Sequence, residues 1–150
     1  MNDVQLFISG AVAFKIAAKA FLNADRADVG GCFFWNAYYY NICLSFELSL
    51  KCFLAHSGFD PNTMKHKIGH DLMKGLDATI DNGFKPHSED IKPLIEILGP
   101  PYRSHELRYL KNQPLILPHS EEQTLELLTK HLEAVVSQIG FDKSYATLKM

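Results

Sequence analysis

The sequence predicts an all-α protein: an up-and-down bundle of four main helices with one or two short ones, in a single domain over residues 1–150. Apolar residues recur at helical spacing in several stretches, which is typical of helices with one buried face. No window alternates apolar and polar residues over the length of a strand with turn residues at both ends. Hydrophobic residues make up 47% of the chain and charged residues 21%, as in soluble globular proteins.

The longest apolar segment, Phe33 to Gly58, is expected to form the central helix around which the other helices pack. It is apolar nearly all round, which is typical of a helix flanked on several sides. Gly58 suits a left-handed C-terminal cap. Glu47 and Lys51 lie inside this segment, and charges are costly in lipid, so we expect no membrane span here.

The helices on either side of this segment are indicated by periodicity and by turn residues. The first is predicted over Val4 to Asn23, and the pair Gly30–Gly31 marks the turn behind it. The stretch Phe59 to Gly69 is expected to be a loop, because Pro61 biases the residue before it away from helix. A further helix is predicted to start near Gly69-His70-Asp71, with Asp71 in its first turn, and to stop at Asn82-Gly83.

The C-terminal third is expected to contain two more helices. One is predicted from Ser88 to Leu98, where Gly99-Pro100-Pro101 should break it. Tyr102 to Lys111 is charged and aromatic, and a short helix is one interpretation of it. The last helix should begin with the capping box Ser120-Glu121-Glu122-Gln123 and end at Gly140, followed by a loose tail over residues 143–150.

Charge and cysteine content limit the functional classes. The formal net charge of −2 gives no global basic signature for nucleic acid or an anionic membrane. Lys15 and Lys19 interrupt the N-terminal apolar run, so it does not resemble a signal peptide. The three cysteines are odd in number and lack a CxxC pair. Free thiols in a reducing, cytoplasmic environment are therefore expected.

Glu47 and Lys51 are the first candidate site residues. They are four residues apart in the order that favours an ion pair on one helix. One interpretation is a salt bridge at the helix edge. The other is that charges among apolar neighbours need partners and line a ligand pocket.

The run Lys65-His66-Lys67-Ile68-Gly69-His70-Asp71 is the second candidate, with His70 and Asp71 at its end. An anion could bind there through lysines and the amide groups at a helix start. The alternative is a solvated basic loop. No HExxH motif or cysteine cluster is present in the sequence, so we expect neither a metal nor another cofactor.

The third candidate is the stretch Tyr102 to Tyr109, which combines arginines, tyrosines and a histidine. Arginine makes forked hydrogen bonds to phosphate, and tyrosine stacks on bases. The stretch therefore suits a surface that recognises phosphate or a nucleotide. The alternative is a connector held in place by its tyrosines. The candidate ligand-binding residues here are Arg103, His105, Arg108 and Tyr109.

Two short patterns resemble the HEPN superfamily of prokaryotic helical domains. The first is Glu47-Leu48-Ser49-Leu50-Lys51-Cys52-Phe53-Leu54, followed by Gly58 and then by Gly69-His70-Asp71-Leu72. The second is Tyr102 to Tyr109, which is similar to a "Y…RY" element in a HEPN-like group of bacterial proteins. Together they cover about the middle two thirds of the chain.

The resemblance implies a helical bundle that is often dimeric, so a cytoplasmic homodimer is expected. Many HEPN proteins are metal-independent ribonucleases with an arginine followed after four to six residues by a histidine. This sequence lacks that motif, because His105 comes two residues after Arg103. The resemblance therefore favours a non-catalytic module in a stress or defence system, with a nucleotide, RNA or a protein as partner. The alternatives are a divergent ribonuclease and a purely structural interaction subunit.

Overall fold

The computed structural model describes residues 2–24, 32–107 and 117–147. This part of the chain is all-α: it contains six α-helices and one short 3₁₀ helix, and no strand. The α-helices are α1 (Asp3–Asn23), α3 (Cys32–His56), α4 (Pro61–Lys67), α5 (Leu72–Asp81), α6 (Ile91–Arg103) and α7 (Glu121–Gln138), and the 3₁₀ helix η1 spans Lys143–Thr147.

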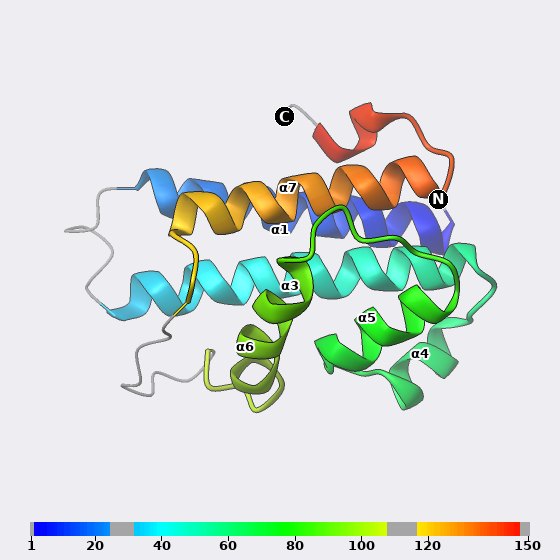
Figure 1. The fold of residues 1–150 in the computed structure, drawn as a ribbon, viewed down its shortest axis with the longest axis horizontal. Coiled ribbons are helices and arrows are strands. Elements are labelled where there is room, and N and C mark those ends of the chain that lie inside the picture. Colours follow the sequence, from blue (N-terminus) through cyan, green and yellow to red (C-terminus); the bar gives the residue numbers. More distant parts are fainter. Residues whose placement is uncertain (1, 25–31, 108–116, 148–150) are drawn as a thin grey trace.

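The central position of α3 is confirmed. The long helices α1 and α7 lie along one side of it, and the shorter helices α4, α5 and α6 pack on the other side (Figure 1). α1 runs in the opposite direction to α3, whereas α7 runs in the same direction as α3 (Figure 1). The described helices therefore differ from the simple up-and-down order that we predicted. Three shorter helices lie between α3 and α7 along the chain, and α7 returns parallel to α3 instead of antiparallel to it.

α1 and α3 approach each other closely. A Cβ atom on Gly10 would come within 2.8 Å of Leu48 Cδ1, so only glycine fits there without a shift of that leucine. Nearby, the buried Ser45 hydroxyl donates a hydrogen bond of 2.6 Å to the carbonyl oxygen of Ala11 on α1. Buried polar groups need such partners. This contact fixes the position of α1 along the central helix.

The predicted loop between residues 59 and 69 was wrong, because α4 forms inside it. Asp60 is the N-cap of α4, and its carboxylate accepts a hydrogen bond of 2.8 Å from the amide of Thr63. Pro61 occupies the first turn, where its missing N–H costs nothing. The proline that argued against helix at Asp60 therefore starts a helix one residue later.

The boundaries of α6 also differ from the prediction. The helix begins at Ile91 rather than at Ser88, and it continues through Pro100 and Pro101 to Arg103. Proline removes a backbone hydrogen bond, but the apolar face continues past it, because Leu98 and Tyr102 are both buried. This continuation places Tyr102 and Arg103 on a helix that faces α3 and α5.

The tail was expected to be loose, and that is wrong for residues 143–147, which form η1. Ala146 in η1 is fully buried, and its carbonyl oxygen accepts a hydrogen bond of 2.8 Å from Lys15 Nζ on α1. Residues 148–150 lie outside the described part of the chain. A short helix was one interpretation of Tyr102 to Lys111. Residues 108–111 of that stretch also lie outside the described part of the chain, and the structure describes the rest as the end of α6 followed by a turn.

Two further expectations concern α1 and the thiols. Among the described helices, α1 alone is long and apolar enough, by length and composition, to cross a membrane, a test that core helices of soluble proteins also pass.

Cys43 and Cys52 are buried and free. Burial raises the pKa of Cys43 well above its ordinary value and that of Cys52 to about 12. Both thiols are therefore protonated and poorly reactive at neutral pH.

Candidate functional site

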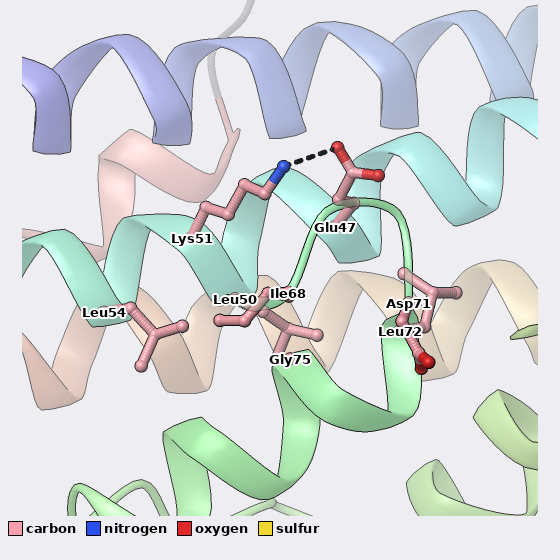
Figure 2. Close-up of a pocket in the computed structure, with 8 residues that line it drawn as sticks. All are labelled: Glu47, Leu50, Lys51, Leu54, Ile68, Asp71, Leu72 and Gly75. Carbon is pink, nitrogen blue, oxygen red and sulfur yellow. Dashed lines mark hydrogen bonds and ion pairs between the residues drawn. The ribbon is translucent and has the colours of Figure 1, made fainter. Parts of the chain in front are cut away.

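The site is built around the carboxylate of Glu47, in the middle of α3. Its side chain is only 7% exposed, and it accepts hydrogen bonds from three donors. Lys51 Nζ lies 3.1 Å from Oε2, while the Tyr102 hydroxyl (2.9 Å) and His70 Nδ1 (2.6 Å) share Oε1. Figure 2 shows the ion pair between Glu47 and Lys51 beside the start of α5. A buried carboxylate needs partners of this kind.

Gly75 allows α5 to approach α3 at this point. A Cβ atom there would lie 3.3 Å from Leu50 Cδ1, which is tighter than ordinary contact. Leu50 and Gly75 face each other directly below Glu47 and Lys51 in Figure 2. The close approach brings the residues just before α5 to the middle of α3.

His70 lies in the turn before α5, and this turn carries it to Glu47. Its Nδ1 is hydrogen-bonded to the carboxylate, but 58% of its side chain is exposed. Its Nε2 atom has no hydrogen-bond partner among the described residues. His70 is therefore held on one edge and presented to solvent on the other.

Asp71 holds a second basic side chain in the same way. It is the N-cap of α5, and its Oδ1 accepts the amide of Lys74 at 3.1 Å. Its Oδ2 accepts a hydrogen bond of 2.9 Å from Arg103 at the end of α6. Asp71 is 17% exposed and Arg103 61% exposed. The expected place of Asp71 in the first turn is thus corrected to the cap position.

His105 completes the described part of the site. It has a backbone φ of 63°, a left-handed conformation that few residues other than glycine adopt. Its ring lies 6.2 Å from that of His70, centroid to centroid. Residues held in such conformations often mark functional sites. The turn after α6 therefore directs a second imidazole toward the first.

Six of the predicted site residues thus lie together, because the three elements that carry them meet at Glu47. They are Glu47, Lys51, His70, Asp71, Arg103 and His105. Arg108 and Tyr109 lie outside the described residues. Lys51 is 14% exposed and points to Glu47 rather than into open solvent.

Tyr102 is the site residue that the sequence did not single out. Burial, and next the negative charge of Glu47, raise the pKa of its hydroxyl far above the ordinary value. It therefore stays protonated and donates to the carboxylate. Its only signal in the sequence was its place at the start of the aromatic and basic stretch. Because the helix was predicted to break at Gly99-Pro100-Pro101, Tyr102 was not expected to be buried on it.

A second hollow of about 400 Å³ lies between the loop before α6 and the first half of α7. Two contacts join polar side chains that line it. Lys130 Nζ lies 3.1 Å from Glu126 Oε1, and His119 Nε2 lies 3.8 Å from Asp90 Oδ2. The Lys130 ammonium is thus paired with a carboxylate, and no described arginine lines this hollow, so the cluster at Glu47 is the stronger candidate.

A buried histidine in the bundle was also missed by the sequence. His131 on α7 is fully buried, and its Nε2 lies 2.8 Å from Ser49 Oγ on α3. Since Ser49 donates to the carbonyl oxygen of Phe46 (2.7 Å), Nε2 is the donor to Ser49. His131 Nδ1 has no partner among the described residues. This Ser–His pair is closed to solvent and acts in the core.

Within the described residues, no group of three or more His, Cys, Asp and Glu side chains is placed to hold a metal ion. Comparison with known proteins adds no family to these observations. A scan against protein-family models, a search of curated proteins and a search of solved structures each found no match.

Proposed function

We propose that this protein is a HEPN-like helical module that binds the phosphate of a nucleotide or of RNA at the surface formed by His70, Arg103 and His105. The observation that carries the proposal is that two exposed basic side chains are each fixed by a largely covered carboxylate. Glu47 holds His70, and Asp71 holds Arg103. Pre-positioned donors bind a ligand with less loss of side-chain entropy.

The guanidinium of Arg103 is suited to phosphate. Asp71 accepts a bond from one terminal nitrogen, which leaves further N–H donors of Arg103 for a second partner. Arginine presents these donors in a planar fork that matches two phosphate oxygens. Lysine would keep the charge but lose the fork.

The substitution Arg103→Ala is expected to weaken RNA binding by about tenfold or more, since hydrogen bonds to charged groups contribute ~1.5–3 kcal/mol. The measurement is fluorescence anisotropy with a labelled single-stranded RNA oligonucleotide, with unlabelled nucleotides as competitors. Lys92→Ala is the matched control, because it removes one exposed positive charge from the same helix. It should change the affinity for RNA by less than about twofold, because salt screens a charge that does not contact the ligand.

Equal losses in the Arg103→Ala and Lys92→Ala variants would point to general charge attraction and count against a site at Arg103. Absence of RNA and nucleotide binding by the unmodified protein would contradict the proposal. A stable complex with another protein, without such binding, would instead favour an interaction subunit.

A metal-independent ribonuclease is the second candidate, and the pair of imidazoles favours it. With Nδ1 on Glu47, His70 presents Nε2 outward, and the His105 ring lies 6.2 Å away. One imidazole would take the proton of a ribose 2′-hydroxyl as its oxygen attacks phosphorus. The other, protonated, would give a proton to the 5′ oxygen as the P–O5′ bond breaks, leaving a 2′,3′-cyclic phosphate. Arg103 would stabilise the charged transition state.

This second function predicts cleavage of labelled RNA in the presence of a chelator, abolished in both Arg103→Ala and His105→Ala. Cleavage that survives both substitutions would come from a contaminating nuclease. Binding without cleavage would leave the non-catalytic module.

A further inference from the structure

The fixed charges of the site cancel in pairs. Lys51 is paired with Glu47 at 3.1 Å, and Arg103 is paired with Asp71 at 2.9 Å. Two positive and two negative side chains leave no net charge. Among the side chains that meet at the site, further positive charge comes only from protonation of His70 and His105, since imidazole is the side chain that ordinarily gains or loses its charge between pH 5 and 8.

The hydrogen bond to Glu47 also fixes which nitrogen of His70 carries the proton. An ionised carboxylate accepts but cannot donate, so Nδ1 is the protonated nitrogen of the neutral ring. Nε2 then presents a lone pair to solvent, and this lone pair cannot bond to a phosphate oxygen. Only after a second proton binds does Nε2 become a donor.

We infer that phosphate binding at this site is coupled to proton uptake by His70 and His105, so that the protein binds its ligand more tightly in mildly acidic conditions and releases it as pH rises. This inference rests on the proposed function of the same site and adds its regulation.

The charged and titratable groups around the two rings come from three elements. α3 presents Glu47 and Lys51, the start of α5 presents Asp71, and α6 presents Tyr102 and Arg103. Tyr102 stays neutral, because burial and Glu47 raise its pKa. Near the rings along the chain are also Lys67, Lys74 and Glu106, whose side chains form no ion pair among the described residues.

The experiment measures RNA affinity between pH 7.5 and 5.5. The probe is a single-stranded oligonucleotide without a terminal phosphate, carrying a dye whose emission does not change over this range. Its internal phosphodiesters keep one charge throughout, so a change in affinity reports on the protein. Affinity should rise toward pH 5.5, by up to about tenfold per pH unit for each proton taken up. Calorimetry in two buffers of different ionisation enthalpy counts those protons directly.

The variants His70→Asn and His105→Asn remove one imidazole each. At position 70, the amide nitrogen can take the place of Nδ1 and keep the bond to Glu47. At position 105, asparagine tolerates the left-handed backbone. Each variant should lower the number of protons taken up and flatten the pH profile. The exposed His56 gives the control variant His56→Asn, which should behave like the unmodified protein.

Binding that is equally tight at both pH values, without proton uptake, would overturn this inference and leave the proposed function standing. A pH dependence that persists in the variant lacking both imidazoles would also overturn it. No binding at any pH would remove the proposed function itself, and this inference with it.

Discussion

Replacing Glu47 by alanine is expected to lower the free energy of unfolding by about 3 kcal/mol, the cost of leaving one member of a buried ion pair without its partner. Lys51 is 14% exposed and would lose its counter-charge. The buried Tyr102 hydroxyl would lose its acceptor as well. Chemical denaturation of the purified protein at neutral pH measures the change.

The chain contains a matched control for this substitution. Glu126 and Lys130 form an ion pair with the same spacing and the same 3.1 Å separation, but their side chains are 64% and 56% exposed. Exposed pairs contribute less than about 1 kcal/mol. Glu126→Ala should therefore change stability little. If Glu47→Ala and Glu126→Ala lower the free energy of unfolding equally, burial of Glu47 would not be the cause of its effect.

Acid is expected to destabilise the folded protein through His131. Complete burial, with a smaller contribution from His87, lowers the pKa of this ring from its ordinary 6.5 to about 3. Between these two values the unfolded chain binds a proton that the folded protein does not. Stability therefore falls as pH drops from about 6.5 toward 3, by up to about 1.4 kcal/mol per pH unit from this group.

The substitution His131→Leu removes the group that binds this proton in the unfolded chain. The variant should therefore lose less stability on acidification. Between pH 7 and pH 4.5 its free energy of unfolding should fall by roughly 2–3 kcal/mol less than that of the unmodified protein. Denaturation curves at several pH values give both slopes. His66→Leu, at an exposed position on α4, should keep the original slope. Parallel slopes for His131→Leu and the unmodified protein would contradict the assignment.

The long helices could be predicted because their signals are local. The capping box of Ser120 and Gln123 is present at the start of α7, as expected. The errors arose where local rules compete with tertiary packing. The paired prolines would end an isolated helix, but burial of Leu98 and Tyr102 carries α6 past them. Pro61 was interpreted as a helix breaker, whereas it occupies the first turn of α4.

The sequence predicted which residues belong to the site but not how they are arranged in space. Apolar surroundings identified Glu47 as a candidate, a basic run before a helix start identified His70, and an aromatic and basic stretch identified Arg103. Their contacts depend on how α5 and α6 pack against α3, and no spacing in the sequence contains that information. The hydrogen bond between Ser49 and His131 joins residues 82 positions apart and gave no signal for the same reason.

The acceptor atom shared by His70 and Tyr102 has a consequence for folding. Glu47 Oε1 receives donors from 23 and 55 residues further along the chain. Two nested loops must therefore close before this arrangement exists, and local fraying of α5 or α6 would dismantle it. A ligand that requires the intact arrangement binds only the fully folded chain. Its binding energy would then protect the whole domain, so protease resistance should increase along the chain and not only beside the bound molecule.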